Sequence, residues 1–526
     1  MPKGMIENAA GRMVPAEING RPAMPFEGVG KYRPEGSKAA PPIRTCIDYP
    51  RDGNKVVADL ATALKNAGLR DGMTISTHHH FRNGDLVANA VFDAAAKLGV
   101  RDLRWFPSAA FPCHEPIIAH LDSGVVHHIE GSMNGPLGDY CSAGKMRGMG
   151  VLRSHGGRWQ AVQDGEVHID IAVIAAPAAD PFGNANGCGI TGEQADATPS
   201  ACGLLGFGLV DSLYADLVIV VTDHLVPFPC IPWQIQGNNV DQVVVLDRVG
   251  DPERIVSGTT VVTKSPDRHL IAEMAAKFVR DAGIMRDGFS FQAGAGGTSL
   301  AFAIYLRKYM KDAGVKARFI RAGSNKYLVE MLEEGLTDYI LDGQTFDLDG
   351  VRSLRDNLRH QDTSPFTSYN WHGKGCFATF LDAVVLGATE VDVDFNANVV
   401  THSDGRLLHG IGGWQNCLAG RCVILPVPSV RDRIPVIVDR VTTLCGPGEL
   451  IDVVVTERGI AINPRRKDLL DAVKGSALPI RPIEDIKAEV QAICGGPPAA
   501  PKLGDKIVAA IKWVDGTVID CVRQVD

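Results

Sequence analysis

Residues 288–299 read Gly288-Phe-Ser-Phe-Gln-Ala-Gly-Ala-Gly-Gly297-Thr-Ser299. The short apolar run predicts a strand over 289–291, and the residues after the glycines predict a helix over 299–312. Glycines between a strand and a helix let backbone N–H groups approach a ligand, and the helix N-terminus favours negative charge. The turn therefore predicts either a site for a phosphate or an oxyanion or a tight connection without a ligand.

Short strands and helices alternate on both sides of this turn. Strands are predicted at 73–76, 169–175, 217–222, 243–246, 317–320, 339–341 and 383–386, a helix at 84–98, and a hairpin of 506–514 and 518–525 around Asp515-Gly516. Near-continuous Val/Ile runs are typical of parallel sheets buried on both faces. Helices between such strands indicate an α/β architecture.

A faint internal repeat supports two related units. Ala67-Gly-Leu-Arg-Asp-Gly72 and Ala282-Gly-Ile-Met-Arg-Asp-Gly288 each precede a strand, a polar or glycine-rich turn and a helix. At 526 residues the chain is too long for one core. We therefore predict two tandem α/β domains with mostly parallel sheets, 44–265 and 266–526, and an extended N-terminal arm over 1–43 that is rich in Pro and Gly.

The composition narrows the classes of partner. The net charge of -8 disfavours nucleic acid, because phosphate binding requires a basic face. No apolar run approaches the ~20 residues of a membrane span, and the first residues lack the apolar core of a secretory signal. The 12 cysteines form no Cys-x-x-Cys pair. We expect a cytoplasmic protein with reduced, mostly buried cysteines and no metal.

Polar loops mark candidate binding sites in the first half. Thr77-His-His-His-Phe-Arg-Asn-Gly-Asp85 lies between a predicted strand and a predicted helix, at the loop edge where open α/β sheets bind ligands. His78, His80 and Arg82 are predicted to bind a substrate carboxylate, with Arg82 as a bidentate clamp, or to form a contact between subunits or domains. A metal site and simple loop packing are the other interpretations. His155-Gly-Gly-Arg158 is predicted to be a further basic loop or a structural turn.

A second glycine cluster, Gly410-Ile-Gly-Gly413-Trp414, follows a polar stretch that contains Asn398. Two such loops in one predicted domain favour a ligand-binding role over a purely structural one. For the first turn, residues 292–299, a dinucleotide site is a further interpretation, but the glycine spacing there does not match the usual fingerprint.

Several segments together resemble the alpha subunit of citrate lyase, in the citrate CoA-transferase family. The resemblance extends in order from about residue 45 to the C-terminus. The segments are Asp71-Gly-Met-Thr-Ile-Ser-Thr-His-His-His-Phe-Arg-Asn-Gly-Asp85, Ser154-His-Gly-Gly-Arg158, Phe182-Gly-Asn-Ala-Asn-Gly187, Gly288-Phe-Ser-Phe-Gln-Ala-Gly-Ala-Gly-Gly297, Leu341-Asp-Gly-Gln-Thr-Phe-Asp347, Phe395-Asn-Ala-Asn-Val399 and Gly459-Ile-Ala-Ile-Asn-Pro464.

This resemblance implies two CoA-transferase-like (NagB/RpiA-like) domains and an enzyme that exchanges acetyl for citrate on a thiol. The thiol would be CoA or a phosphopantetheine-type group on an acyl carrier protein. The implied partners are the beta (citryl lyase) and gamma (acyl carrier) subunits of an oligomeric complex.

The resemblance also assigns candidate roles. Gln344 falls where many CoA-transferases have a Glu nucleophile. Since an amide accepts no acyl group, this fits direct exchange through a mixed anhydride. Asn398 and Gly413 join Gln344 as candidate catalytic residues, and Trp414 is a candidate substrate contact. The candidate cofactor-binding residues are Gly294, Gly296, Gly297, Gly410 and Gly412.

The chain also departs from the family pattern. Trp414, Asn416 and Cys417 stand where the family usually has a His and then an Asp-Thr pair, and 322–326 and 368–371 differ as well. Three alternatives follow: a CoA-transferase for another di- or tricarboxylate such as citramalate, a catalytically degenerate subunit with this fold, and a dinucleotide-binding oxidoreductase.

Overall fold

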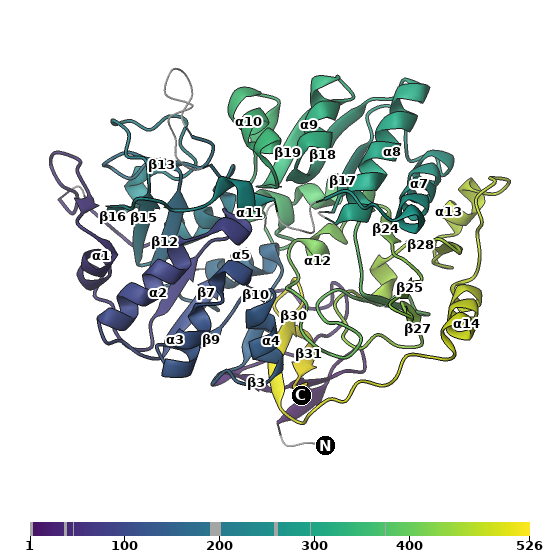
Figure 1. The fold of residues 1–526 in the computed structure, drawn as a ribbon, viewed down its shortest axis with the longest axis horizontal. Helices are drawn as coiled ribbons and strands as arrows, with labels where there is room; N and C mark the ends of the chain where they lie inside the picture. Colours follow the sequence, from purple (N-terminus) through teal and green to yellow (C-terminus); the bar gives the residue numbers. More distant parts are fainter. Residues whose placement is uncertain are drawn as a thin grey trace.

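The computed structural model describes residues 4–35, 39–45, 47–189, 201–256, 261–294, 296–373 and 375–525. The chain forms two α/β halves that lie side by side (Figure 1). A smaller three-stranded sheet lies between them.

The N-terminal half is built on a seven-stranded parallel sheet in the order β5-β16-β15-β12-β6-β7-β9. Its strands are β5 (Val56–Val57), β6 (Thr74–Thr77), β7 (Leu103–Pro107), β9 (Val126–Ile129), β12 (Ile171–Ala176), β15 (Leu217–Thr222) and β16 (Gln242–Val245). Its helices are α1 (Leu60–Asn66), α2 (Val87–Lys97), α3 (Ile117–Ser123), α4 (Pro136–Ser142), α5 (His155–Gln163) and α6 (Leu209–Tyr214). Every residue of β12 is buried, as expected for a strand covered on both faces.

The C-terminal half contains an eight-stranded sheet in the order β20-β19-β18-β17-β21-β24-β28-β29, parallel except for its last pair. Its strands are β17 (Ser290–Ala293), β18 (Ala317–Ser324), β19 (Thr337–Thr345), β20 (His360–Asp362), β21 (Ala383–Val385), β24 (Val423–Pro426), β28 (Val453–Thr456) and β29 (Gly459–Ile462). Its helices include α7 (Pro266–Asp281), α8 (Gly297–Ala313), α9 (Lys326–Glu333), α10 (Leu348–Asp356), α11 (Pro365–Tyr369), α12 (Trp414–Cys417), α13 (Lys467–Ala472) and α14 (Ile483–Cys494).

The two sheets share one topology. In chain order, β6, β7, β9, β12, β15 and β16 occupy the spatial order 3-2-1-4-5-6, and so do β17, β18, β19, β21, β24 and β28. In each half the direction of winding reverses between the first and fourth strands, which are β6 and β12 in one half and β17 and β21 in the other. Ligands of open α/β sheets bind at such switch points, beyond the carboxyl ends of the strands. The predicted tandem α/β architecture is confirmed.

The C-terminal hairpin joins the two halves. Its strands β30 (Ile507–Lys512) and β31 (Val518–Arg523) are antiparallel, and β30 also pairs in parallel with β11 (Gly150–Leu152) of the N-terminal half. The hairpin predicted from Asp515-Gly516 is confirmed. Its pairing with β11 was not predicted, because the turn signal is local and the partner strand lies more than 350 residues away.

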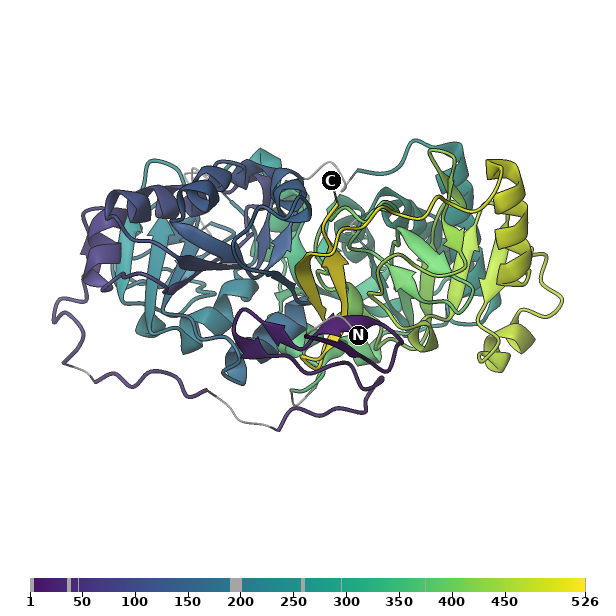
Figure 2. The same ribbon diagram turned by 90° about the horizontal axis from the view of Figure 1, so that it is seen from below.

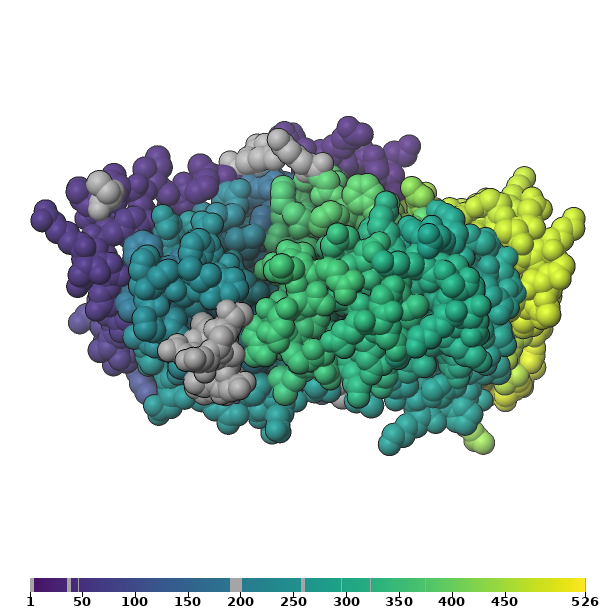
Figure 3. Space-filling view, turned by 90° about the horizontal axis from the view of Figure 1, so that it is seen from above, coloured from purple at the N-terminus to yellow at the C-terminus, as the bar shows by residue number. Residues whose placement is uncertain are grey.

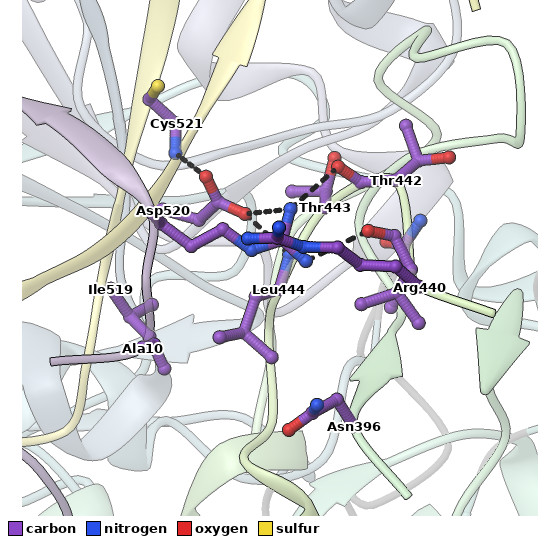
Figure 4. A network of polar contacts seen from close by, with 12 residues as sticks. Ala10, Asn396, Arg440, Thr442, Thr443, Leu444, Ile519, Asp520 and Cys521 are labelled. Carbon is purple, nitrogen blue, oxygen red and sulfur yellow. Dashed lines mark hydrogen bonds and ion pairs between the residues drawn. The ribbon is translucent and has the colours of Figure 1, made fainter. Parts of the chain in front are cut away.

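The first part of the N-terminal arm, through Phe26, lies on this hairpin, and the chain then runs along the N-terminal half (Figure 2). The pairs β1 (Met5–Glu7)–β2 (Met13–Pro15) and β3 (Glu17–Ile18)–β4 (Arg21–Pro22) are short and antiparallel. The Asn8 side chain donates hydrogen bonds to the carbonyls of Val518 and Ile519, at 3.1 and 2.8 Å. Figure 4 shows Asp520 accepting hydrogen bonds from the backbone N–H groups of Cys521 and Leu444, which connects β31 to the C-terminal half.

The two halves meet along a close-packed seam (Figure 3). Trp159 of α5 packs on Phe366 of α11, with 5.3 Å between ring centroids. Gly156 lies so close to the C-terminal half that a Cβ there would be 2.2 Å from the carbonyl oxygen of Tyr369. The seam therefore requires glycine at this position.

Candidate functional site

The carboxyl ends of both sheets meet at this seam. Gln344, near the end of β19, points its amide nitrogen at the backbone carbonyl of His79, 3.5 Å away, in the loop after β6. The carboxyl ends of β17, β18 and β19 lie side by side, so Gln344 is two strands, or about 10 Å, from the glycine turn after β17. The predicted histidine loop, Gln344 and the glycine turn thus surround one region.

The first histidine of the loop belongs to a buried ionic cluster. Arg158 of α5 binds both carboxylate oxygens of Asp211 at 2.8 Å, and His78 Nε2 lies 3.1 Å from the same carboxylate. Burial alone would raise the pKa of Asp211, but Arg158 and His78 hold it well below its usual range. Burial lowers the pKa of His78 although Asp211 opposes the shift. Asp211 therefore remains ionised and pairs mainly with Arg158.

The second histidine lies in an aromatic stack at the seam. His79 stacks on His155, with 5.5 Å between centroids, and packs on Phe207 at 4.5 Å. Its Nδ1 lies 2.6 Å from Ser108 Oγ. Burial lowers the pKa of His155 to about 3 and that of His79 well below its ordinary value. Both rings are therefore neutral at pH 7 and form a wall without charge beside Gln344.

The end of the loop contacts the C-terminal half through Arg82. Its guanidinium carbon lies 4.5 Å from the ring centre of Phe346, two residues beyond Gln344. Burial lowers the pKa of Arg82 to about 10, so the side chain stays charged at neutral pH. His80 is also buried, stacks on His78 at 5.2 Å, and has a pKa well below its ordinary value because of burial. Arg82 is thus a predicted substrate contact that touches the Gln344 segment of the opposite half.

The glycine turn after β17 presents backbone instead of side chains. The N–H of Gly294 donates to the carbonyl of Val385 in β21, which holds the turn at the switch point. Gly296 is the N-cap of α8, and a Cβ there would have no atom within 4 Å. At Gly297 a Cβ would be 2.6 Å from the carbonyl of Val261. Ala295 lies outside the described residues. The open side at Gly296 and the N-terminus of the 17-residue helix α8 fit an anionic or developing oxyanion group.

The second glycine loop connects the halves and lies over the same switch point. The carbonyl of Gly412 accepts a hydrogen bond of 2.9 Å from the N–H of His155. Asn416 accepts from the N–H of Gly156 and donates to Ser154 Oγ, each at 3.1 Å. Trp414 is buried, and its indole N–H donates to the carbonyl of Gly387, just beyond β21, at 2.7 Å. This loop therefore places Gly413 and Trp414 against the end of β21.

Two predicted residues have other surroundings. The side chain of Asn398 is buried and bonded to Glu390 and Thr401 in a small sheet beside the main one. A Cβ at Gly410 would be 1.8 Å from Ser132 Oγ, so the absence of a side chain here allows the two halves to pack closely. Within the part of the chain that the structure describes, neither residue contacts Gln344.

The prediction of a basic loop or structural turn at 155–158 is wrong, because these residues begin the helix α5. Ser154 is the N-cap of α5, accepting from the N–H of Gly157, and the following residues form the first helical turn. The two glycines suggested a loop, but Gly156 is needed for contact with the opposite half.

Sequence reasoning missed Arg321 and Tyr369, which lie between Gln344 and the second glycine loop. Nη1 of Arg321 donates to Tyr369 Oη at 2.6 Å, and a Cβ at Gly413 would be 2.7 Å from the same oxygen. The sequence did contain an indication of Arg321, because a charged residue within the strand β18 is unusual at a buried position.

One group among the described residues has the donor set of a metal site. Ligand atoms of His168, Asp170 and Asp216 lie within 4.8 Å of one another. Asp170 and Asp216 directly precede β12 and β15, so the group is at the amino edge of the sheet, opposite the seam. Exposed acidic groups of this kind are common without a metal, and the group takes no part in the site described above.

Residues 53–525 match the family model described as "Citrate lyase, alpha subunit (CitF)". The chain belongs to the citrate lyase alpha subunit family. It is 40% identical to the citrate lyase alpha chain of Klebsiella pneumoniae over 473 residues, covering 90% of this chain and 91% of the relative. It is 39% identical to the chain of that name from Escherichia coli strain K12, with the same coverage. As a member of the citrate lyase alpha subunit family the chain is an enzyme subunit, as the resemblance implied.

Solved structures agree with this family. A Streptococcus mutans structure, assigned as the alpha subunit of citrate lyase in complex with citrate, is 42% identical with a TM-score of 0.90, covering 99% of this chain and 100% of its own. A chain of a Pseudomonas malonate decarboxylase hetero-tetramer in complex with malonate shares the fold at 19% identity, with a TM-score of 0.59 and coverage of 85% and 95%. The predicted CoA-transferase-like fold class is confirmed. Among the described helices, none is long and apolar enough to cross a membrane.

Proposed function

We propose that this chain exchanges the acyl group of a thioester, converting an acetyl thioester and citrate into a citryl thioester and acetate. The observation that carries the proposal is the position of Gln344, at the meeting point of both carboxyl edges. Its amide faces the neutral wall of His79 and His155. A carboxamide at this point cannot accept an acyl group, which supports direct exchange between the two bound substrates.

The exchange would take place in two balanced steps. A carboxylate oxygen of citrate attacks the thioester carbonyl, the C–S bond breaks, and a thiolate and a mixed anhydride result. The thiolate then attacks the citryl carbonyl, the C–O bond breaks, and acetate leaves. Each step passes through an oxyanion, for which backbone N–H groups near Gly296, Gly297 and Gly413 are the expected donors. Gln344 would donate a hydrogen bond to an acyl oxygen.

The thiol would be CoA or a phosphopantetheine-type group on an acyl carrier protein. Open backbone at Gly296 and the start of α8 fit the oxygen-rich acyl and pantetheine end of such a thiol. The partners would be the beta and gamma subunits of a citrate-lyase-type complex in the cytoplasm, as the family name of an alpha subunit suggests. We propose the boundary between the two domains near residue 265, where α7 begins the second α/β unit.

A related acid such as citramalate is the second candidate substrate. It is favoured by Trp414, which fills the space beside Gly387 where the family usually has a histidine. A larger apolar ring there would select an acid of different shape from citrate.

The test is an exchange assay with the purified chain. Acetyl-CoA is mixed with citrate, citramalate and other carboxylic acids, and new thioesters are identified by mass spectrometry. We expect one acid to yield a new acyl-CoA together with acetate. If no acid yields a thioester at high protein concentration, the chain is catalytically degenerate in isolation and the proposal fails.

A second experiment tests the direct exchange. Gln344→Glu supplies a carboxylate at the same position and is expected to trap an acyl group covalently, detected as a mass increase of the protein. Gln361→Glu, an exposed residue of the neighbouring strand β20, is the matched control and should trap none. Covalent acyl-enzyme in the wild type would contradict direct exchange.

A further inference from the structure

Arg321 carries a buried charge without a carboxylate partner. Its relative exposure is 0%. Nη1 donates to Tyr369 Oη, and the guanidinium carbon lies 3.8 Å from the centre of the Tyr369 ring. No ion pair within the described residues includes Arg321. Buried arginines are ordinarily paired with an acid, because an uncompensated buried charge is costly.

None of the neighbouring titratable groups among the described residues pairs with this charge. Burial raises the pKa of Tyr369 to about 12, with Arg321 opposing the rise, and raises that of Cys417 to about 12 as well. His155 is neutral because burial lowers its pKa to about 3. The carboxylate of Asp342, on the adjacent strand β19, is occupied by the N–H groups of Ser324 and Gln344.

The unpaired N–H donors of Arg321 lie on the same edge of its guanidinium group. Nε and Nη2 are both buried and without a hydrogen-bond partner within the described residues. These two nitrogens form one side of the planar guanidinium. That side binds a carboxylate through two parallel N–H···O bonds.

The position of this edge connects it to the reaction site. Nη2 would be 2.5 Å from a Cβ at Gly343, the residue before Gln344. On the other side, Tyr369 Oη lies against Gly413. The guanidinium thus lies between the candidate exchange residue and the second glycine loop.

We propose that the Nε–Nη2 edge of Arg321, steadied by Tyr369, binds a carboxylate of the acid substrate other than the one that reacts. The acid must then carry at least two carboxylates. This assignment rests on the proposed function for the identity of the ligand. A phosphate would take the same donors, but a carboxylate fits better because the edge lies among buried neutral groups beside the acyl position.

This proposed carboxylate subsite is tested directly by measuring the binding of acids in the absence of any thioester. Citrate, citramalate, propane-1,2,3-tricarboxylate, acetate and inorganic phosphate are each titrated calorimetrically into the full chain. We expect wild type to bind a di- or tricarboxylate and to bind acetate and phosphate far more weakly. Arg321→Met should weaken that binding roughly ten- to hundredfold. Arg318→Met, at an exposed position of the same strand, is the matched control and should bind as wild type does.

Thermal denaturation without ligand shows whether the variants fold. Arg321→Met is expected to melt at or above the wild-type temperature, because it removes an uncompensated buried charge. If it does not fold, Gly343→Ala replaces it, since the added methyl displaces the guanidinium, and should weaken acid binding likewise. Unchanged acid affinity in the folded variant, no acid binding by wild type, or Arg321-dependent binding of phosphate alone would each overturn the subsite.

The exchange assay separates the two proposals. If acids bind through Arg321 but no thioester is exchanged, the proposed function fails and the subsite stands. If Arg321→Met exchanges citrate with the wild-type KM, the subsite fails and the function stands.

Discussion

The loops after β6 and β17 leave equivalent strands at equivalent switch points, but their contents differ. The loop after β6 contains histidines and Arg82 and lies over the buried pair of Asp211 and Arg158. The turn after β17 has bare backbone at Gly296 and the open start of α8. The same topology therefore carries packed side chains after β6 in one half and open backbone at Gly296 after β17 in the other. We infer that the N-terminal loop forms a rigid wall and that the thioester is held by the C-terminal turn.

The largest expected effect is on stability, and it concerns the buried ion pair under the loop after β6. Asp211→Asn leaves the buried charge of Arg158 uncompensated and should lower the free energy of unfolding by about 3–5 kcal/mol. Urea denaturation measures this effect. Asp93→Asn, which breaks an exposed pair with His120, is the control and should cost less than about 1 kcal/mol. If both variants lost the same free energy of unfolding, the buried cluster would stabilise the fold no more than an exposed ion pair does.

The pH dependence of stability is the next effect in size. His114 lies 2.9 Å from Asp85, the last residue of the loop. Burial lowers the pKa of His114, but hydrogen bonds and charge from Asp85 and Cys113 outweigh it and raise the pKa to about 9. Because the folded pKa exceeds the unfolded value of about 6.5, the stabilisation is complete below pH 6.5 and is lost as the pH rises through 9.

This stabilisation corresponds to roughly 3 kcal/mol in all. Wild type should therefore lose stability between pH 7 and 10 relative to His114→Gln, which has no such charge to lose. Urea denaturation at several pH values gives the difference curve. Parallel curves for the two proteins would show that His114 is neutral, with its Nδ1 accepting from the N–H of Phe111 at 3.0 Å and its Nε2–H donating to Asp85.

The third prediction concerns activity at the C-terminal turn. Gly296 has a φ of -73° and space around its Cα, so Gly296→Ala should fold with stability within about 1 kcal/mol of wild type. Its methyl group would displace a bound thioester, and exchange should slow roughly ten- to hundredfold. The rate of acyl-CoA formation measures this. An unchanged rate would show that the thioester does not approach α8.

The smallest expected effect concerns the connection between the two regions. Asn416→Asp supplies the acid that the family resemblance implies at this position, and its carboxylate can accept from both the Gly156 N–H and the Ser154 hydroxyl. Stability should change by less than about 1 kcal/mol, since these partners lie at the start of α5, where negative charge is favoured. Thermal denaturation checks it. A large loss would show that the amide donor of Asn416 is itself required.

Part of the site was predictable from the sequence and part was not. Gln344, Arg82, Gly296 and Gly413 follow from local patterns and the family resemblance, and the structure brings their segments to one seam. The partner of His78 was not predictable, because Asp211 lies on a distant helix.

The sequence by itself determined the tandem α/β fold, since strand and helix periodicity, the glycine turns and the Asp515-Gly516 hairpin are local signals. Only the tertiary structure decided which of the two equivalent loops is packed with side chains and that β30 pairs with β11. It also decided that Arg321 is buried without a carboxylate partner among the described residues. The physical reason is that burial and electrostatic pairing depend on residues brought together from distant parts of the chain.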